Sequence, residues 1–167
     1  MSNPLISESV LAEIDKWLAK YPAAKSQSAL LPALRLVQDQ HNGWLNKELL
    51  NAVADYICVP RIKAYEVASF YSMYELEPIG KHKICVCTNI ACMLRGSKNI
   101  INHLEKKLKV KIGETTEDGR YTLKEVECLA ACGGAPMMQI DDREYYENLT
   151  PDQVDVILAD IEKKDMR

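Results

Sequence analysis

A chain of 167 residues with 47% hydrophobic and 27% charged residues has the composition of a globular protein that folds in water around an ordinary core. Its net charge of -3 gives no sign of the basic surface of a nucleic-acid-binding protein. No apolar run approaches the roughly 18 to 20 residues that span a bilayer, and a long one, Ser28 to Val37, contains Pro32 and Arg35. We therefore expect no nucleic-acid partner and no direct insertion into a membrane.

The N-terminal segment carries no visible targeting signal. Its first 25 residues mix lysines with acidic residues, and they contain neither an apolar core segment nor an arginine-rich amphipathic helix. The chain is therefore expected to be bacterial or already processed, and to remain in a reducing compartment. Six cysteines in such a compartment favour metal ligation over a disulfide framework.

The N-terminal part is predicted to be a helical bundle. Apolar residues recur there at the spacing of one helix face, and polar caps, prolines and Asn42-Gly43 mark where helices begin and end. The expected helices run from Val10 to Leu18, from near Ser28 to Asn42, from Asn46 to Ile57, and after Pro60 through Ala68. Together they form an expected N-terminal helical domain at residues 1–77.

A proline and a glycine at Pro78-Ile79-Gly80 end the helices, and we place the start of a second domain, residues 78–167, at this point. Apolar β-branched residues predict a buried strand at Lys83–Cys87. The glycine and serine at Gly96-Ser97 open a helix with one apolar stripe, which is the usual crossover back over a sheet.

Turn residues organise the remainder of the second domain. Asp118-Gly119 predicts one hairpin turn, and Asp141-Asp142 predicts a second. Thr150-Pro151 followed by Gln153 predicts a capped start of the last helix. The order strand, helix, three strands, helix implies an α/β fold with a four-stranded mixed sheet and helices packed on it.

Four cysteines form two local pairs. Cys87 and Cys92 have C-x4-C spacing, Cys128 and Cys132 have C-x3-C spacing, and 35 residues separate the pairs. Each pair can hold one iron from a single loop, so this arrangement suits four thiolates on a two-iron cluster. Zinc modules more often use C-x2-C pairs, and zinc, disulfides or free thiols remain as alternatives.

The other two cysteines are not expected to be ligands. Cys85 lies in mid-strand and points away from the loop, and Cys58 is interpreted as a small buried hydrophobic residue. No histidine lies inside a cysteine pair, which argues against a Rieske-type cluster. Gly133 and Gly134 beside Cys132 either turn the chain or let the backbone approach the sulfurs.

Further motifs accompany the cysteines and extend over most of the chain. They are Phe70-Tyr71, Pro78-Ile79-Gly80, Val86-Cys87-Thr88, Cys92, Arg95-Gly96, Glu127-Cys128-Leu129, Cys132, Ala135-Pro136-Met137-Met138 and Tyr145. With them the sequence resembles the thioredoxin-like [2Fe-2S] subunit of respiratory complex I, NADH:quinone oxidoreductase, over roughly residues 28–165. Ala130 departs from the family pattern, in which glycine is frequent at this position.

The resemblance implies one [2Fe-2S] cluster held by Cys87, Cys92, Cys128 and Cys132, in a thioredoxin-like domain. It also implies two partners, a flavoprotein subunit that binds FMN and NADH and the larger iron-sulfur subunit of complex I. The chain has no phosphate-binding glycine loop of its own, so FMN and NADH are expected only in the partner and no catalysis is expected from the isolated chain. The implied location is cytoplasmic and peripheral to the inner membrane through the complex, or the matrix side in a mitochondrion.

Three alternatives remain at this stage. The nearest alternative within electron transfer is the equivalent subunit of an NAD-linked hydrogenase or formate dehydrogenase. A free-standing thioredoxin-like ferredoxin is disfavoured by the helical N-terminal half, because a diffusing carrier needs no such docking module. A zinc-stabilised interaction module without a redox role belongs to a different functional class.

Overall fold

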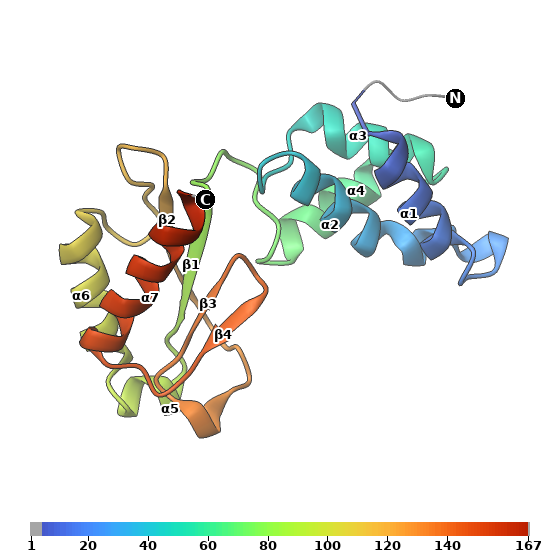
Figure 1. The fold of residues 1–167 in the computed structure, drawn as a ribbon. Coiled ribbons are helices and arrows are strands. Elements are labelled where there is room, and N and C mark those ends of the chain that lie inside the picture. The colour runs from blue at the N-terminus through green and yellow to red at the C-terminus, as the bar shows by residue number, and fades with distance from the viewer. Residues whose placement is uncertain (1–4, 167) are drawn as a thin grey trace. The chain divides into compact units, whose positions relative to one another are not determined.

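The computed structural model describes residues 5–166. The chain divides into a helical unit that ends at Ile79 and an α/β unit that begins at Gly80, and each unit has its own core (Figure 1). The sequence places a domain boundary after residue 77. That residues 1–77 and 78–167 are separate functional domains stays a prediction. None of the helices in the described part of the chain has both the length and the apolar character needed to cross a membrane.

Between residues 5 and 79, the helical unit contains four α-helices and one 3-10 helix. These are α1 (Glu8–Leu18), η1 (Ala23–Ala29), α2 (Leu30–Gln40), α3 (Lys47–Tyr56) and α4 (Arg61–Phe70). Side-chain caps begin two of them, since Ser7 Oγ accepts the Val10 amide at 3.4 Å and Asn46 Oδ1 accepts the Leu49 amide at 2.8 Å. The predicted helices are therefore present, whereas η1 was not expected.

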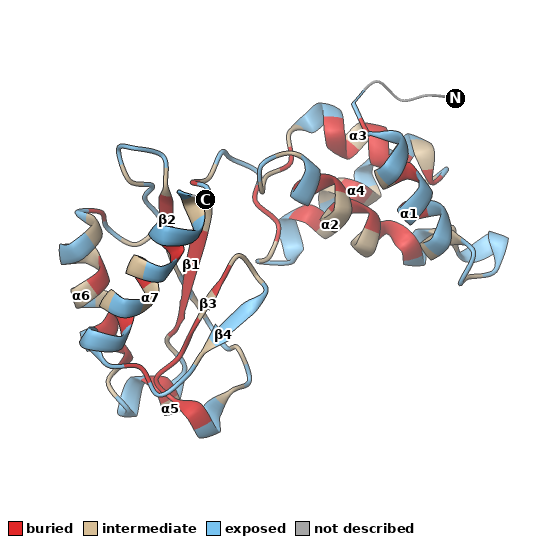
Figure 2. Ribbon diagram, viewed as in Figure 1, coloured by how far each residue is buried: buried red, intermediate tan, exposed pale blue. Residues whose placement is uncertain are grey.

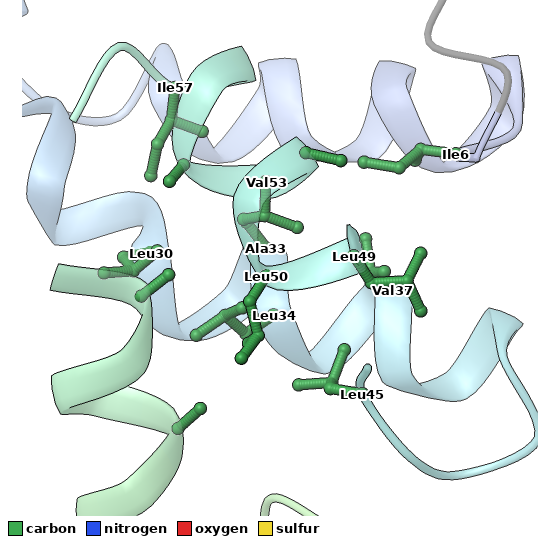
Figure 3. Packing of buried hydrophobic residues seen from close by; sticks show 14 of the residues in the cluster. Ile6, Leu30, Ala33, Leu34, Val37, Leu45, Leu49, Leu50, Val53 and Ile57 are labelled. Carbon is green, nitrogen blue, oxygen red and sulfur yellow. The ribbon is translucent and has the colours of Figure 1, made fainter. Parts of the chain in front are cut away.

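The core of the helical unit is made by apolar side chains from all four α-helices (Figure 3). A buried polar side chain ties the segment after α4 to this core. Gln38, on α2, donates its amide to the Met73 carbonyl at 3.0 Å and accepts the Glu75 backbone N–H at 2.8 Å. Because both ends of the amide are bonded, burying Gln38 leaves no orphaned polar group.

Cys58 corrects the sequence-based interpretation, because it is exposed rather than buried. It follows the end of α3 with a φ of 57°, a left-handed conformation that ends the helix. That backbone turn carries the side chain out to solvent, which apolar neighbours in the sequence could not reveal.

The α/β unit is built on a four-stranded mixed sheet, which confirms the predicted fold class. Its elements are β1 (His82–Cys87), α5 (Ile90–Leu94), α6 (Ser97–Leu108), β2 (Tyr121–Val126), the 3-10 turn η2 (Cys132–Gly134), β3 (Met138–Ile140), β4 (Glu144–Tyr146) and α7 (Pro151–Asp165). The strand order is β2-β1-β3-β4, with β1 and β2 parallel and the other pairs antiparallel. Most of β1 is buried, from Lys83 to Cys87 (Figure 2).

Helices α6 and α7 pack on the sheet and on each other (Figure 1). Their apolar faces meet alternate residues of the strands in one cluster, which includes Ile84 and Val86 from β1, Leu104 from α6 and Leu158 from α7. The predicted capping box of α7 is present, with Thr150 and Gln153 bonded reciprocally. The cluster fixes which face of β1 points toward the helices.

The two predicted hairpins differ in extent. Asp141 and Asp142 both have positive φ, 56° and 53°, between β3 and β4, as a tight primed turn requires. Around Asp118-Gly119, by contrast, the only ladder contact is an isolated bridge from Thr115 to Thr122. The segment before this turn still bonds to the outer edge of β2, where the Thr116 N–H donates to the Tyr121 carbonyl at 2.8 Å and the Leu123 N–H donates to the Glu114 carbonyl at 3.1 Å.

A buried ion pair fastens the β3–β4 turn to β1. Lys83 Nζ lies 2.8 Å from Asp142 Oδ2, and the two side chains are only 3% and 15% exposed. In addition, Asp141 Oδ1 accepts the Lys83 backbone N–H at 2.8 Å. The turn is thus held by both carboxylates.

Candidate iron-sulfur site

The two cysteine pairs lie at one end of the sheet because they follow parallel strands. Cys87 is the last residue of β1 and stands opposite Val126, the last residue of β2. Cys128 follows two residues later, and Cys87 Sγ lies 4.0 Å from the carbonyl oxygen of Glu127 between them. Parallel pairing therefore brings together two loops that are far apart in the sequence.

The short helix α5 turns Cys92 back toward Cys87. Asn89 begins it by accepting the Ile90 amide on its side-chain oxygen at 2.8 Å. Cys92 is 2% exposed and packs with Cys87, Ala135 and Met137 in a small apolar cluster. Sequence analysis missed α5, although Asn89 ahead of an apolar i, i+3, i+4 set is a usable signal for such a turn.

The Cys92 thiol interacts with two other members of the quartet. Burial, followed by the hydrogen bond with Cys87, raises the pKa of Cys92 to about 11, and the charge of Cys132 acts in the same direction. Three of the four predicted ligands therefore lie close enough to influence one another. A thiol in this setting keeps its proton at neutral pH until a metal displaces it.

The second pair is more open than the first. Cys128 and Cys132 are exposed, whereas Cys87 and Cys92 are buried. Cys128 Sγ accepts the backbone N–H of Ala130 at 3.3 Å. A loop amide directed at a cysteine sulfur stabilises negative charge there, as a ligated thiolate requires.

No three His, Cys, Asp or Glu side chains are arranged to hold a single metal ion anywhere between residues 5 and 166. The donor set instead suits a two-iron group, because it has two pairs of sulfurs, one from each of two adjoining loops, with a backbone donor on one of them. Each pair can take one iron, and no oxygen or nitrogen ligand is needed. The residues present fit that group.

Cys85 and the histidines, which are not expected to be cluster ligands, lie away from the two cysteine pairs. Cys85 stands in the middle of the sheet, opposite Gln139 of β3 and Lys124 of β2. His82 is at the opposite end of β1 from Cys87 and bonds to Asp141 at 2.8 Å. The remaining histidines are also bonded away from the quartet, His103 to Asp155 and His41 to the Trp44 carbonyl.

Ala130 has a φ of 59°, within the left-handed region that favours glycine. The structure thus gives a physical reason for the family preference from which this chain departs. The left-handed turn aims the Ala130 N–H at Cys128 Sγ, and alanine keeps this bond at a modest cost in backbone strain. The residue at 130 therefore shapes the loop of the second pair.

The two glycines after Cys132 have different roles. A Cβ atom on Gly133 would meet nothing within 4 Å, whereas on Gly134 it would overlap the side chain of Glu147, with the Glu147 Cβ only 2.6 Å away. Gly134 is also paired through its carbonyl, which accepts the Asn148 N–H at 2.6 Å. Gly134 is thus required by a close approach to the segment after β4.

We predict that Gly134→Ala destabilises the loop of the second cysteine pair by about 1–3 kcal/mol, because the added methyl group must displace the Glu147 side chain, including its Cβ. Gly133→Ala is the matched control, and its effect is expected to be below about 0.5 kcal/mol. Denaturant midpoints of the full-length variants measure both. Equal midpoints for the two variants would contradict the contact with Glu147.

With the geometry in place, comparison with known proteins decides the family. Residues 14–162 match the family model described as thioredoxin-like [2Fe-2S] ferredoxin. The chain belongs to this family. The thioredoxin-like [2Fe-2S] ferredoxin model covers both cysteine pairs and much of the helical unit.

The curated relatives of the chain include components of NADH-quinone oxidoreductase and of NADH dehydrogenase. The chain is 50% identical over 141 residues to the E subunit of NADH-quinone oxidoreductase from Rickettsia conorii, covering 84% of each chain. It is 48% identical over 140 residues to the mitochondrial NADH dehydrogenase [ubiquinone] flavoprotein 2 of Dictyostelium discoideum, covering 84% of this chain and 56% of that one. These relatives are components of an oxidoreductase of several subunits.

The fold also matches a solved structure. A crystal structure of an NAD+-reducing [NiFe]-hydrogenase in the air-oxidized state aligns with a TM-score of 0.68 and 22% identity. The alignment covers 81% of this chain but only 23% of the hydrogenase chain. At this level of identity the likeness concerns the fold.

Proposed function

We propose that the chain is the [2Fe-2S] electron-transfer subunit of an NADH:quinone oxidoreductase, with one cluster held by Cys87, Cys92, Cys128 and Cys132. The observation that carries the proposal is the convergence of two cysteine pairs at one end of the sheet, in a chain about half identical to a component of that enzyme in Rickettsia conorii. When bound, such a cluster takes up or releases one electron at a time. The sequence identity to the E subunit favours respiratory complex I over the hydrogenase alternative, which is supported by likeness of fold alone.

Different residues around the four cysteines exclude water from the site and stabilise its negative charge. The apolar cluster of Cys87, Cys92, Ala135 and Met137 keeps water from the first pair. At the second pair, the N–H of Ala130 donates to Cys128 Sγ and stabilises thiolate charge. One side of the site is thus buried within the unit, and the other side is open to a partner.

The partners we propose are a flavoprotein subunit that binds FMN and NADH, which exchanges single electrons with this chain, and the larger iron-sulfur subunit of the complex. The two-electron chemistry of NADH then belongs to the flavin and not to this chain. Attachment to the inner membrane is proposed to occur through the complex, with the chain on its cytoplasmic or matrix side.

The test is low-temperature EPR of the anaerobically purified chain before and after dithionite, with iron and zinc counted on the same sample. We expect a silent oxidised state, a spin-half signal with an average g below 2 after reduction, and about two irons per chain. NADH added to the isolated chain is expected to leave the spectrum unchanged. Stoichiometric zinc in place of iron would instead support the interaction module and refute electron transfer.

A further inference from the structure

His82 stands where three elements of the α/β unit meet, and both of its ring nitrogens face a carboxylate. Nδ1 lies 2.8 Å from Asp141 Oδ2, in the β3–β4 turn, and Nε2 lies 3.2 Å from both oxygens of Asp165, the last residue of α7. The His82 side chain is only 16% exposed. It therefore joins the first residue of β1 to a turn and a helix end that are 59 and 83 residues away in the sequence.

This arrangement restricts the protonation of His82. An ionised carboxylate only accepts hydrogen bonds, whereas a neutral imidazole carries one donor nitrogen and one acceptor nitrogen. A neutral ring would therefore satisfy one aspartate and turn a lone pair toward the other. The doubly protonated, cationic ring donates to both aspartates.

The other two histidines supply the contrast, because each faces a single acceptor. His103 Nε2 lies 2.9 Å from Asp155 Oδ1, and His41 Nδ1 lies 3.1 Å from the Trp44 carbonyl oxygen. A neutral ring with its proton on that nitrogen keeps either bond. Among the three histidines, all of them within residues 5–166, His82 alone needs both protons to keep its contacts.

The charges beside His82 are arranged around the two aspartates. The hydrogen bond from Lys81, and then that from His82, hold the pKa of Asp165 below its usual value, so this carboxylate stays an acceptor at neutral pH. Lys81 is bonded to Asp165 and Lys83 to Asp142. Both ammonium groups next to His82 in the sequence are thus held by carboxylates.

The remaining neighbours leave the ring open to protons. A pocket of about 210 Å³ reaches His82, and the charged groups that line it together with the two aspartates are Arg143, Glu144 and Lys164. From β2, the ring of Tyr121 lies with its centroid 5.9 Å from that of His82, and burial raises the pKa of Tyr121, which keeps it neutral. Water in the pocket can therefore exchange protons with His82 while the unit stays folded.

Loss of one proton weakens the contact with α7 first. The Nδ1 bond to Asp141 is the shorter of the two, so a neutral ring keeps its proton there and turns a lone pair toward Asp165. Among the charged contacts of Asp165 within residues 5–166, this leaves the ion pair with Lys81, whose side chain is 59% exposed. An ion pair with so exposed a partner contributes little.

We propose that His82 is a proton-dependent clamp: with both ring nitrogens protonated it ties the last turn of α7 to β1 and to the β3–β4 turn, and loss of one proton releases the α7 turn. Because the clamped form holds one proton more than the released form, the clamp is complete in mildly acidic solution and is lost as the pH rises. It lies at the opposite end of β1 from Cys87, so the proposal does not depend on the iron-sulfur cluster.

The first test is NMR of the histidine ring nitrogens in the full-length protein, recorded between about pH 5.5 and pH 9. We expect His82 to keep both of its protons to a higher pH than His103 does. His103 is the matched comparison because it faces a carboxylate on one nitrogen only. If His82 loses its second proton at the same pH as His103, or at a lower one, the clamp is refuted.

The second test uses amide hydrogen exchange at the C-terminal turn of α7, corrected for the intrinsic effect of pH on exchange. In the unmodified chain, protection of this turn is expected to fall at least about fivefold between about pH 6 and pH 8.5. Asp141→Asn should abolish that dependence and keep the protection, changing it less than about twofold. The asparagine amide N–H can donate to Nδ1 of a neutral His82, whose Nε2 proton then stays on Asp165.

Two further variants complete the comparison. His82→Gln, which removes the cation, is expected to leave the turn weakly protected at both pH values. His103→Gln is the matched control and should keep the full pH response of the unmodified chain. A response in Asp141→Asn equal to that of the unmodified chain, or no response in the unmodified chain, would overturn the proposal.

Discussion

Replacing Cys87 with alanine is expected to reduce the iron content and the reduced-state EPR signal by more than about tenfold, because the proposed cluster loses one of four thiolate ligands. Alanine is preferred to serine, since a serine oxygen is still able to ligate iron. Cys85→Ala is the matched control: both cysteines lie on β1, two residues apart, and both are 3% exposed. We expect Cys85→Ala to keep about two irons per chain.

The comparison of Cys87→Ala with Cys85→Ala separates the loss of a cluster ligand from an effect on folding. Removing a buried sulfur costs both variants a similar packing energy, about 1 kcal/mol, so their iron-free forms should unfold at similar denaturant concentrations. Only the position relative to the loop differs, because Cys87 ends the strand and Cys85 pairs in mid-sheet. Loss of the cluster in Cys85→Ala with its retention in Cys87→Ala would reverse the ligand assignment.

The elements that the sequence predicted correctly are those with a strong local signal. The capping box at Thr150 and Gln153 and the double aspartate at Asp141-Asp142 each specify one backbone geometry, and both geometries are present. The 3-10 helix η1 was missed, because Ala23–Ala29 has neither an apolar stripe nor a side-chain cap. Cys58 was misplaced because its exposure depends on one left-handed residue and not on the hydrophobicity of its neighbours.

In the candidate site, too, local sequence signals predict some features and not others. The spacing of the cysteines predicts which side chains belong together, since it is a property of the sequence. It cannot reveal that Cys92 packs against Ala135 and Met137, or that Gly134 lies against Glu147, because both contacts join segments that are separated in the chain. The hydrogen bond from Ala130 to Cys128 depends on a positive φ at a non-glycine residue, which no composition rule predicts.

Asp142→Asn is expected to destabilise the α/β unit by about 3 kcal/mol, because it leaves the ammonium of Lys83, 3% exposed, without the carboxylate that lies 2.8 Å away. Asparagine tolerates positive φ as aspartate does, so the turn geometry is preserved and the change isolates the charge. The denaturant midpoint of the full-length protein, followed by far-UV circular dichroism, measures the effect.

Two further variants show whether burial of the charge is the cause. Asp160→Asn removes an ion pair with Lys163 whose side chains are 59% and 68% exposed, and it should cost less than about 0.5 kcal/mol. Adding Lys83→Met to Asp142→Asn should recover most of the lost stability, because an apolar side chain in that position has no charge to desolvate. If the double variant is no more stable than Asp142→Asn alone, then the turn is held by the hydrogen bonds of its aspartates, and the buried charge pair is not what fastens the β3–β4 turn to β1.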